Sequence, residues 1–241
     1  MKVNLFITCL VDQLCPEVGV ATVDVLEKAG CEVTFDERQT CCGQPAFNTG
    51  YRKEARKFAE KFIEIFESSD ANVIVSPSGS CVAMVKHFHE LFPKDKKWRD
   101  RAEKIAEKTH ELTSFLVNIL EKEKFGAKLS GKVTWHDACH ALRDLGLKTE
   151  PRKLLQKVEE AEFVELNGSD ECCGFGGTFS VKYAEISNAI LDKKIENIEA
   201  SGADFVVACD SSCLMQIGGK LSRTGSKIKT KHIAEILASQ D

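Results

Sequence analysis

The stretch QTCCGQPAF, residues 39–47, places Cys41 and Cys42 side by side and follows them with a glycine. A second version, ECCGFGGTF, occupies residues 171–179. Adjacent cysteines form a strained disulfide, because neighbouring Cα atoms lie only about 3.8 Å apart. Two such pairs, each opening onto glycine, indicate a duplicated unit that uses paired thiols for something other than a disulfide.

The duplication extends along the chain. In each half a strand-like run ends in a cysteine, KVNLFITC at Cys9 and KVTWHDAC at Cys139. A helical stretch, a second strand, the double cysteine, an amphipathic helix and a third strand follow in the same order. Thirty-one residues separate Cys9 from Cys41, and thirty-two separate Cys139 from Cys172. Agreement in both pattern and spacing predicts an internal repeat.

Alternating strands and helices predict an α/β fold of two tandem, pseudo-symmetric repeats, each a small, largely parallel sheet flanked by helices. We assign residues 1–125 to the first cysteine-rich repeat and 126–241 to the second, with the polar segment 122–131 as the linker. Functional groups gather where parallel strands end, so each half is expected to bring four thiols to one sheet edge. The predicted site residues are Cys9, Cys41, Cys42, Cys81, Cys139, Cys172, Cys173 and Cys213.

Composition narrows the class of protein. The chain has 241 residues and a net charge of -4, and its lysines and arginines are spread along the sequence rather than clustered. This distribution argues against a nucleic-acid partner. No apolar run approaches the ~18 residues of a transmembrane segment, and the N-terminus lacks a signal-peptide pattern, so we expect a cytoplasmic protein. Eleven cysteines in a reducing compartment indicate metal or redox chemistry before disulfides.

The adjacent thiols favour one kind of metal site over another. Thiolates are soft ligands that suit zinc, copper(I) and iron–sulfur clusters. Successive side chains diverge, so an adjacent pair serves a single zinc ion poorly, whereas a cluster offers each sulfur its own iron. Glycine after the pair lets backbone N–H groups turn toward sulfur. An iron–sulfur cluster in each half is the preferred interpretation, and zinc is the alternative.

The remaining cysteines and histidines receive structural interpretations. Cys15 and Cys31 have no counterpart in the other half and are expected to be small buried residues. Histidines flank Cys139 or occupy corresponding positions in the two tails, and hydrogen bonding, capping or packing is expected for them rather than ligation. They are His136 and His140 beside Cys139, and His110 and His232 in the tails.

Several phrases carry a family resemblance: TCLVD, CCGQPAFN, VSPSGSC, CCGFGGTFSVK, CLMQIGG and HIAE, from residue 8 to residue 235. They resemble the CCG domain found in the cysteine-rich subunit of heterodisulfide reductase and in the iron–sulfur subunit of glycolate oxidase, and more closely the lactate-utilisation protein A family. The resemblance implies an iron–sulfur protein, with up to one 4Fe–4S centre per repeat. It would work with two other proteins, one iron–sulfur and one smaller, to oxidise L-lactate to pyruvate, its own role being electron transfer.

One departure from that pattern concerns the ligand number. The cysteine-rich subunit of heterodisulfide reductase ends each motif in C-x-x-C and so offers five thiols, whereas here Ser78 and Asp210 stand three residues before the last cysteines. Cys209 lies one residue out of register, so the identity of any fifth ligand stays open. Two other functions also stay open: a subunit of a thiol or disulfide reductase, and a zinc-stabilised interaction module.

Overall fold

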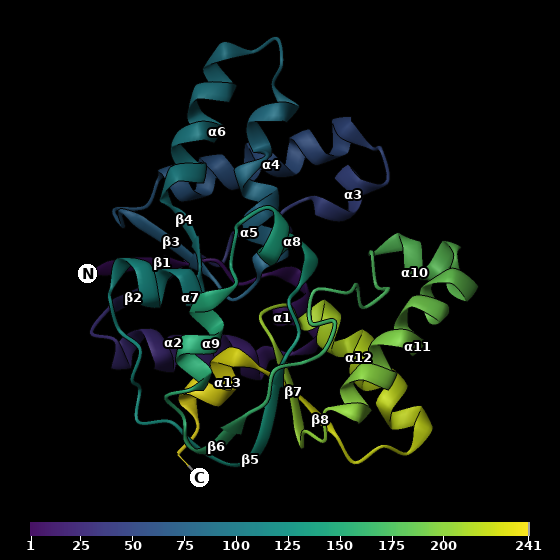
Figure 1. Cartoon of the computed structure of the whole chain (residues 1–241). Coiled ribbons are helices and arrows are strands. Elements are labelled where there is room, and N and C mark those ends of the chain that lie inside the picture. The colour runs from purple at the N-terminus through teal and green to yellow at the C-terminus, as the bar shows by residue number, and fades with distance from the viewer. Residues whose placement is uncertain (241) are drawn as a thin grey trace.

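Two four-stranded sheets form the frame of the molecule, whose computed structural model describes residues 1–240 (Figure 1). The strand orders are β2-β1-β3-β4 and β6-β5-β7-β8, and every described pairing is parallel. The predicted pair of similar, parallel-sheet repeats is therefore confirmed. The strands are β1 (Lys2–Leu5), β2 (Glu32–Phe35), β3 (Val73–Ser76), β4 (Thr109–Glu111), β5 (Lys128–Trp135), β6 (Glu159–Phe163), β7 (Phe205–Ala208) and β8 (Lys229–His232).

Helices connect the strands and cover the sheets. The first repeat contains α1 (Cys9–Leu14), α2 (Pro16–Lys28), α3 (Gln44–Asn48), α4 (Arg52–Glu67), α5 (Gly79–Lys86), η1 (Phe88–Leu91), α6 (Lys96–Lys108), α7 (Leu112–Ser114) and η2 (Phe115–Ile119). The second contains α8 (Cys139–Arg143), α9 (Thr149–Leu155), α10 (Thr178–Lys182), α11 (Ala184–Ala200), α12 (Ser211–Thr224) and α13 (Ile233–Ala238). Within residues 1–240, no helix is long and apolar enough to cross a bilayer.

Each sheet gains a fourth strand that the sequence pattern does not reveal. The strands β4 and β8 are short and polar, THE and KTKH, and each pairs with the third strand of its own repeat. The expected linker is also shorter than 122–131, because β5 begins at Lys128. The division of the chain at 125/126 itself stays a prediction.

Each repeat folds into one lobe of the molecule, and apolar side chains pack between the two lobes. Phe6, Phe62, Phe66 and Phe88 form the centre of a core that belongs to the first lobe alone. A second core crosses between the lobes and joins residues of β1 to residues of β5, α9 and α13. The tail helix α13 packs on α2 of the first repeat, and α7 packs on α9 of the second (Figure 1). This exchange of tail helices fixes how the two sheets face each other.

Candidate metal centre

The first four cysteines, here called the first quartet, come together at the carboxyl edge of the first sheet. Cys9 opens α1 just after β1, Cys41 and Cys42 lie between β2 and α3, and Cys81 lies in the first turn of α5 after β3. The Sγ atoms of Cys9 and Cys41 are 3.6 Å apart, and those of Cys42 and Cys81 are 3.3 Å apart. The expected convergence of these four thiols is confirmed.

The second quartet repeats this arrangement. Cys139 opens α8 just after β5, Cys172 and Cys173 lie between β6 and α10, and Cys213 lies in the first turn of α12 after β7. The thiols of Cys139 and Cys173 both direct hydrogen bonds toward Cys172, and Cys173 also interacts with Cys213. The duplicated sequence therefore builds two thiol sets of the same connectivity.

Glycine shapes each double-cysteine loop. Gly43 and Gly174 have φ values of 82° and 81°, in the left-handed region that glycine adopts without strain. Their backbone N–H groups point at sulfur, with Gly43 N 3.4 Å from Cys41 Sγ and Gly174 N 3.3 Å from Cys172 Sγ. A Cβ on Gly174 would lie 2.5 Å from the carbonyl oxygen of Ser187. The predicted role of these glycines in directing N–H groups toward sulfur is confirmed.

The hydrogen bonds create one strongly acidic thiol in each quartet. Bonds from Cys42 and Cys9, with the N–H of Gly43, lower the pKa of Cys41 to about 3. Bonds from Cys139 and Cys173, with the N–H of Gly174, lower the pKa of Cys172 to about 2. Because the thiolate is the form that binds metals, each quartet presents a metal-binding sulfur at neutral pH.

Both quartets line the same cavity, which has a volume of about 360 Å³. The lobes meet closely at this edge, because α5 of the first lobe packs on α8 of the second (Figure 1). At their contact a Cβ on Gly79 would lie only 2.5 Å from the Cβ of Ala141. The sequence places one site in each lobe, and the structure shows that the two sites share a cavity between them.

The residues at the fifth-ligand positions bind each other across the lobes. The hydroxyl of Ser78 donates to Asp210 Oδ1 at 2.6 Å, and the hydroxyl of Ser80 donates to the same oxygen at 2.7 Å. The backbone N–H of Ser80 also donates to Asp210 Oδ2 at 3.1 Å. The Ser78 hydroxyl in turn caps α5 by accepting from the N–H of Cys81 at 3.3 Å. Ser78 and Asp210 are therefore engaged in holding the lobes together.

The other cysteines lie apart from the cavity. Cys209 is 1% exposed and is absent from the described cavity lining. Cys31 is buried as expected, whereas Cys15 is only half-buried, which corrects its interpretation as a core residue. Within residues 1–240 all eleven cysteines are free thiols.

His136 belongs to the second site, which the sequence analysis did not predict. Its side chain is fully buried, and within the described part of the chain neither ring nitrogen has an oxygen or nitrogen partner. One ring nitrogen, Cys173 Sγ and Cys213 Sγ all lie within 4.8 Å of one another. The burial of His136 agrees with the expected core position, whereas its closeness to two thiols of the quartet was not predicted. His140 lines the cavity, and His232 caps α13 as predicted, accepting from the N–H of Ala234 at 3.1 Å.

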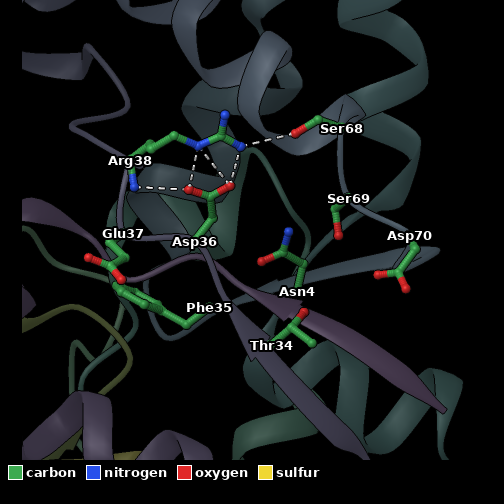
Figure 2. Close-up of a pocket in the computed structure, with 9 residues that line it drawn as sticks. All are labelled: Asn4, Thr34, Phe35, Asp36, Glu37, Arg38, Ser68, Ser69 and Asp70. Atoms are coloured by element: carbon green, nitrogen blue, oxygen red, sulfur yellow. Dashed lines mark hydrogen bonds and ion pairs between the residues drawn. The ribbon is translucent and has the colours of Figure 1, made fainter.

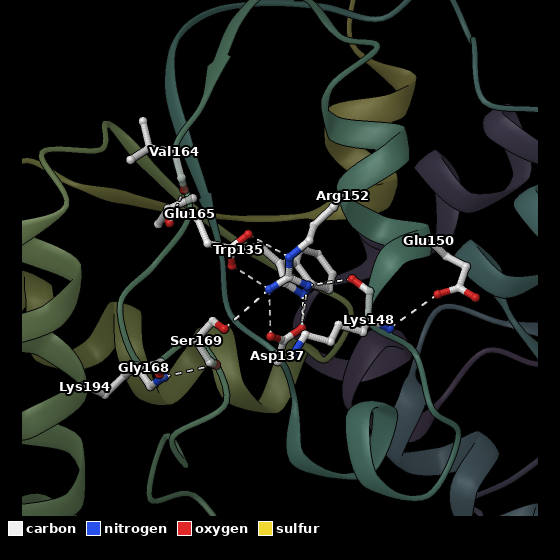
Figure 3. A network of polar contacts seen from close by, with 11 residues as sticks. Trp135, Asp137, Lys148, Glu150, Arg152, Val164, Glu165, Gly168, Ser169 and Lys194 are labelled. Carbon is white, nitrogen blue, oxygen red and sulfur yellow. Dashed lines mark hydrogen bonds and ion pairs between the residues drawn. The ribbon is translucent and has the colours of Figure 1, made fainter.

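A buried ion pair anchors the segment that leads into Cys139 (Figure 3). The guanidinium of Arg152 donates to both carboxylate oxygens of Asp137 at 2.9 and 2.8 Å, and Trp135 Nε1 donates to the same carboxylate at 2.7 Å. Burial opposes the charge on Asp137, but the hydrogen bonds from Arg152 outweigh burial and lower the pKa of the carboxyl. These bonds fix the course of the chain from the end of β5 to α8.

A buried lysine anchors the loop before the second double cysteine. Lys194 of α11 is 0% exposed, and its Nζ donates to the carbonyl oxygens of Gly168 at 2.6 Å and Ser169 at 3.2 Å (Figure 3). Burial lowers the pKa of its amino group. The loop that carries Cys172 and Cys173 is thereby tied to α11.

A larger hollow of about 580 Å³ lies beside β2 and offers little chemistry (Figure 2). Its guanidinium, from Arg38, is paired with Asp36 through Nε at 2.9 Å and also bonds Ser68 Oγ at 3.2 Å. Its nine described lining residues include neither cysteine nor histidine. The cavity between the quartets is therefore the candidate functional site.

Comparison with known proteins agrees with the repeat and its thiols. A model of the cysteine-rich domain CCG matches residues 3–86 and 133–218. "Lactate utilization protein A" of Bacillus subtilis (strain 168) is 51% identical over 240 residues, covering 100% of both chains. The protein of the same name from Macrococcus caseolyticus (strain JCSC5402) is 52% identical over 100% of this chain and 97% of its own.

A solved structure shares the fold. A hypothetical protein from Helicobacter pylori matches 98% of this chain with a TM-score of 0.66 and 13% identity, over 48% of its own length. The curated relatives match over full length and at about half identity, well above what a shared fold alone produces. This chain, with its two copies of the cysteine-rich CCG domain, belongs to the lactate utilization protein A family.

Proposed function

We propose that this chain is a cytoplasmic iron–sulfur protein that transfers electrons in a system oxidising L-lactate to pyruvate. The observation that carries the proposal is the gathering of two thiol quartets around one cavity. The name of the relatives supports lactate as the substrate. The two partner proteins, one iron–sulfur and one smaller, are those that the sequence resemblance implies. The chain then acts as a subunit that receives electrons from one partner and delivers them to another.

The residues present suit an iron–sulfur group. Each lobe offers four free thiols, one of which has a lowered pKa, and a backbone N–H directed at a sulfur. Four thiolates are the usual ligand set of a [4Fe–4S] or [2Fe–2S] centre, and N–H groups at sulfur tune its reduction potential. Such a group, when bound, supplies one-electron storage. The first quartet would hold one centre and the second quartet the other.

A second function is favoured by the shape of the site. The cavity lies between the quartets rather than beside one of them, so a small sulfur compound entering it would meet thiols of both lobes. This arrangement supports a role within a thiol or disulfide reductase as the alternative. A zinc-stabilised interaction module is the third candidate, because thiols and an imidazole are also zinc ligands.

The test is metal analysis of protein purified without oxygen. Iron, acid-labile sulfide and zinc are measured per chain, and an electron paramagnetic resonance spectrum is recorded after reduction. Cys42→Ala should lose the iron of the first lobe and interrupt lactate-dependent electron flow. The matched control is Cys31→Ala, because Cys31 is a buried cysteine outside both quartets and should retain all of its iron.

The outcomes separate the candidates. Iron with matching sulfide, reduced in the presence of lactate and the partner proteins, supports electron transfer. Iron that a disulfide compound reoxidises, with no response to lactate, supports the reductase. Stoichiometric zinc without sulfide supports the interaction module and rejects both redox functions. Unchanged iron in Cys42→Ala would reject the ligand assignment of the first quartet.

A further inference from the structure

We propose that His136 is a metal ligand of the centre held by the second quartet. The inference rests on the proposed function and deepens it, because it makes the two centres of the chain chemically different. The second centre would have a donor set of four thiolates and one imidazole, whereas the first would have thiolates alone.

The position of His136 favours ligation. It directly follows β5, where its backbone N–H donates to the carbonyl of Val207 at 2.9 Å, so the main chain holds the residue at the sheet edge. One of its ring nitrogens, Cys173 Sγ and Cys213 Sγ all lie within 4.8 Å of one another. Three donor atoms from three segments thus converge within the space that one metal ion and its ligands require.

The environment of the ring offers its nitrogens sulfur rather than oxygen. His136 is 0% exposed, no oxygen or nitrogen hydrogen-bond partner of either ring nitrogen lies within residues 1–240, and the polar neighbour of the ring is the thiol of Cys213. An unpaired polar group buried in protein costs roughly 1–3 kcal/mol, so such groups are normally paired. A metal bound to one nitrogen removes part of this cost. A core histidine of purely structural function would be expected to find a carbonyl or hydroxyl, as His232 does with Pro77 at 2.8 Å.

The alternative donors near the second quartet are already engaged. Asp210 occupies the position of the missing fifth thiol, but Ser78 and Ser80 of the other lobe donate three hydrogen bonds to its carboxylate. His136 lies with Cys173 and Cys213 in one group of possible metal donors, and Cys209 is not a member of that group. His140 lines the cavity but is also outside the group, so it serves as the control below.

The first lobe has no equivalent of this residue. The counterpart of His136 is Phe6, which follows β1 and donates its N–H to Val75 at 2.8 Å, as His136 does to Val207. A second pair of positions also differs between the lobes. The eleventh residue of α4 is Phe62, whereas the eleventh residue of the equivalent helix α11 is Lys194. Phe6 and Phe62 form an edge-to-face pair with ring centroids 4.8 Å apart. The first lobe thus has two phenylalanines, Phe6 and Phe62, at the positions where the second lobe has His136 and Lys194.

The difference in donor set has an electrochemical consequence. An imidazole beside four thiolates changes the ligands of the second centre, and the potential of an iron–sulfur centre depends on its ligands. The two centres are therefore expected to differ in reduction potential.

The experiment detects nitrogen at the metal directly. Whole protein labelled with ¹⁵N-histidine is purified without oxygen, reduced, and measured by pulsed electron paramagnetic resonance. A strong histidine-nitrogen coupling is expected in the natural chain, lost in His136→Phe, and retained in His140→Phe, which removes the other histidine beside Cys139. His136→Gln provides a second variant of similar size, and the spectrum of the natural chain needs no variant at all.

Each outcome decides the inference. Iron and sulfide without a histidine coupling, or a coupling that survives His136→Phe, would overturn it and leave electron transfer standing. Zinc without sulfide would reject electron transfer, and X-ray absorption would then decide the ligand. A nitrogen neighbour of zinc that disappears in His136→Phe supports ligation, and an unchanged zinc spectrum excludes it. A chain isolated with no metal would overturn both proposals.

Discussion

Replacing Glu111 by glutamine should remove a pH dependence from the stability of the protein. Glu111 ends β4 and is 1% exposed. Its Oε2 caps α7 by accepting from the N–H groups of Thr113 at 2.7 Å and Ser114 at 3.1 Å, whereas Oε1 has no partner among the described residues. Burial, with a smaller contribution from the nearby charge of Asp210, outweighs these hydrogen bonds and raises the pKa of this carboxyl from 4.5 to about 7.

The magnitude follows from that difference in pKa. A raised pKa in the folded state means that the folded protein holds the proton more tightly than the unfolded chain does. The stabilisation is complete below about pH 4.5 and is lost as the pH rises to about 7. At about 1.4 kcal/mol per pH unit, the total loss is about 3 kcal/mol, of which about 2–3 kcal/mol falls between pH 5 and pH 8.

Urea unfolding of the natural chain and Glu111→Gln, each at pH 5 and pH 8, measures the effect. Glutamine keeps an oxygen for the α7 cap and cannot ionise, so the variant should gain about 2–3 kcal/mol relative to the natural chain on going from pH 5 to pH 8. All thiols and other carboxyls are common to both proteins and cancel in the difference. A pH-independent difference between the two free energies of unfolding would refute the reasoning.

Two further changes test how the sites are supported. Gly174→Ala places a Cβ 2.5 Å from Ser187 O at a φ of 81°, so we expect about 2 kcal/mol of destabilisation and loss of metal from the second lobe. Gly219→Ala, in open space within α12, should instead stabilise by about 0.5–1 kcal/mol, and equal effects of the two changes would contradict the steric explanation. Arg152→Met strands the carboxylate of Asp137, whose side chain is 1% exposed, and should cost about 3–5 kcal/mol near pH 7. Because the pKa of Asp137 is lowered in the folded protein, that cost should shrink in urea unfolding below about pH 4, and a constant cost would contradict the ion-pair assignment.

The two quartets are predictable from sequence because the chain contains its own comparison. Matching intervals between cysteines identify the eight repeated thiols without reference to any structure. The parallel-sheet rule then places each set at one edge, since strands that run the same way end at the same side. The glycine after each pair predicts the N–H contacts to Cys41 and Cys172 for the same local reason.

The shared cavity is not predictable in this way. It depends on how the lobes are placed, and that is decided by contacts between segments far apart in the sequence. The packing of α13 on α2, the contact of Gly79 with Ala141, and the bonds from Ser78 to Asp210 set that placement. None of these contacts leaves a periodic or spaced signal within either repeat.

The register of the tails shows where pattern matching fails. His110 and His232 align in the sequence, yet the pairing partners differ. Ser76 in β3 pairs with Glu111, and the equivalent Ala208 in β7 pairs with His232. The structural counterpart of His232 is therefore Glu111, and both residues cap the helix that follows. Short polar strands carry too little periodicity to fix a register, so the histidine match misled the alignment.

Comparing the two repeats also shows that equivalent positions hold Phe6 in one and His136 in the other. Duplication preserves what both copies need, which here is the sheet, the thiols and the glycines. A buried position that is aromatic in one copy and basic in the other has therefore diverged without loss of the fold. Both positions follow the same strand and make the same backbone hydrogen bond, so the scaffold is constant while the buried side chain differs. Chemical difference between two sites on one scaffold is what a directional transfer of electrons requires.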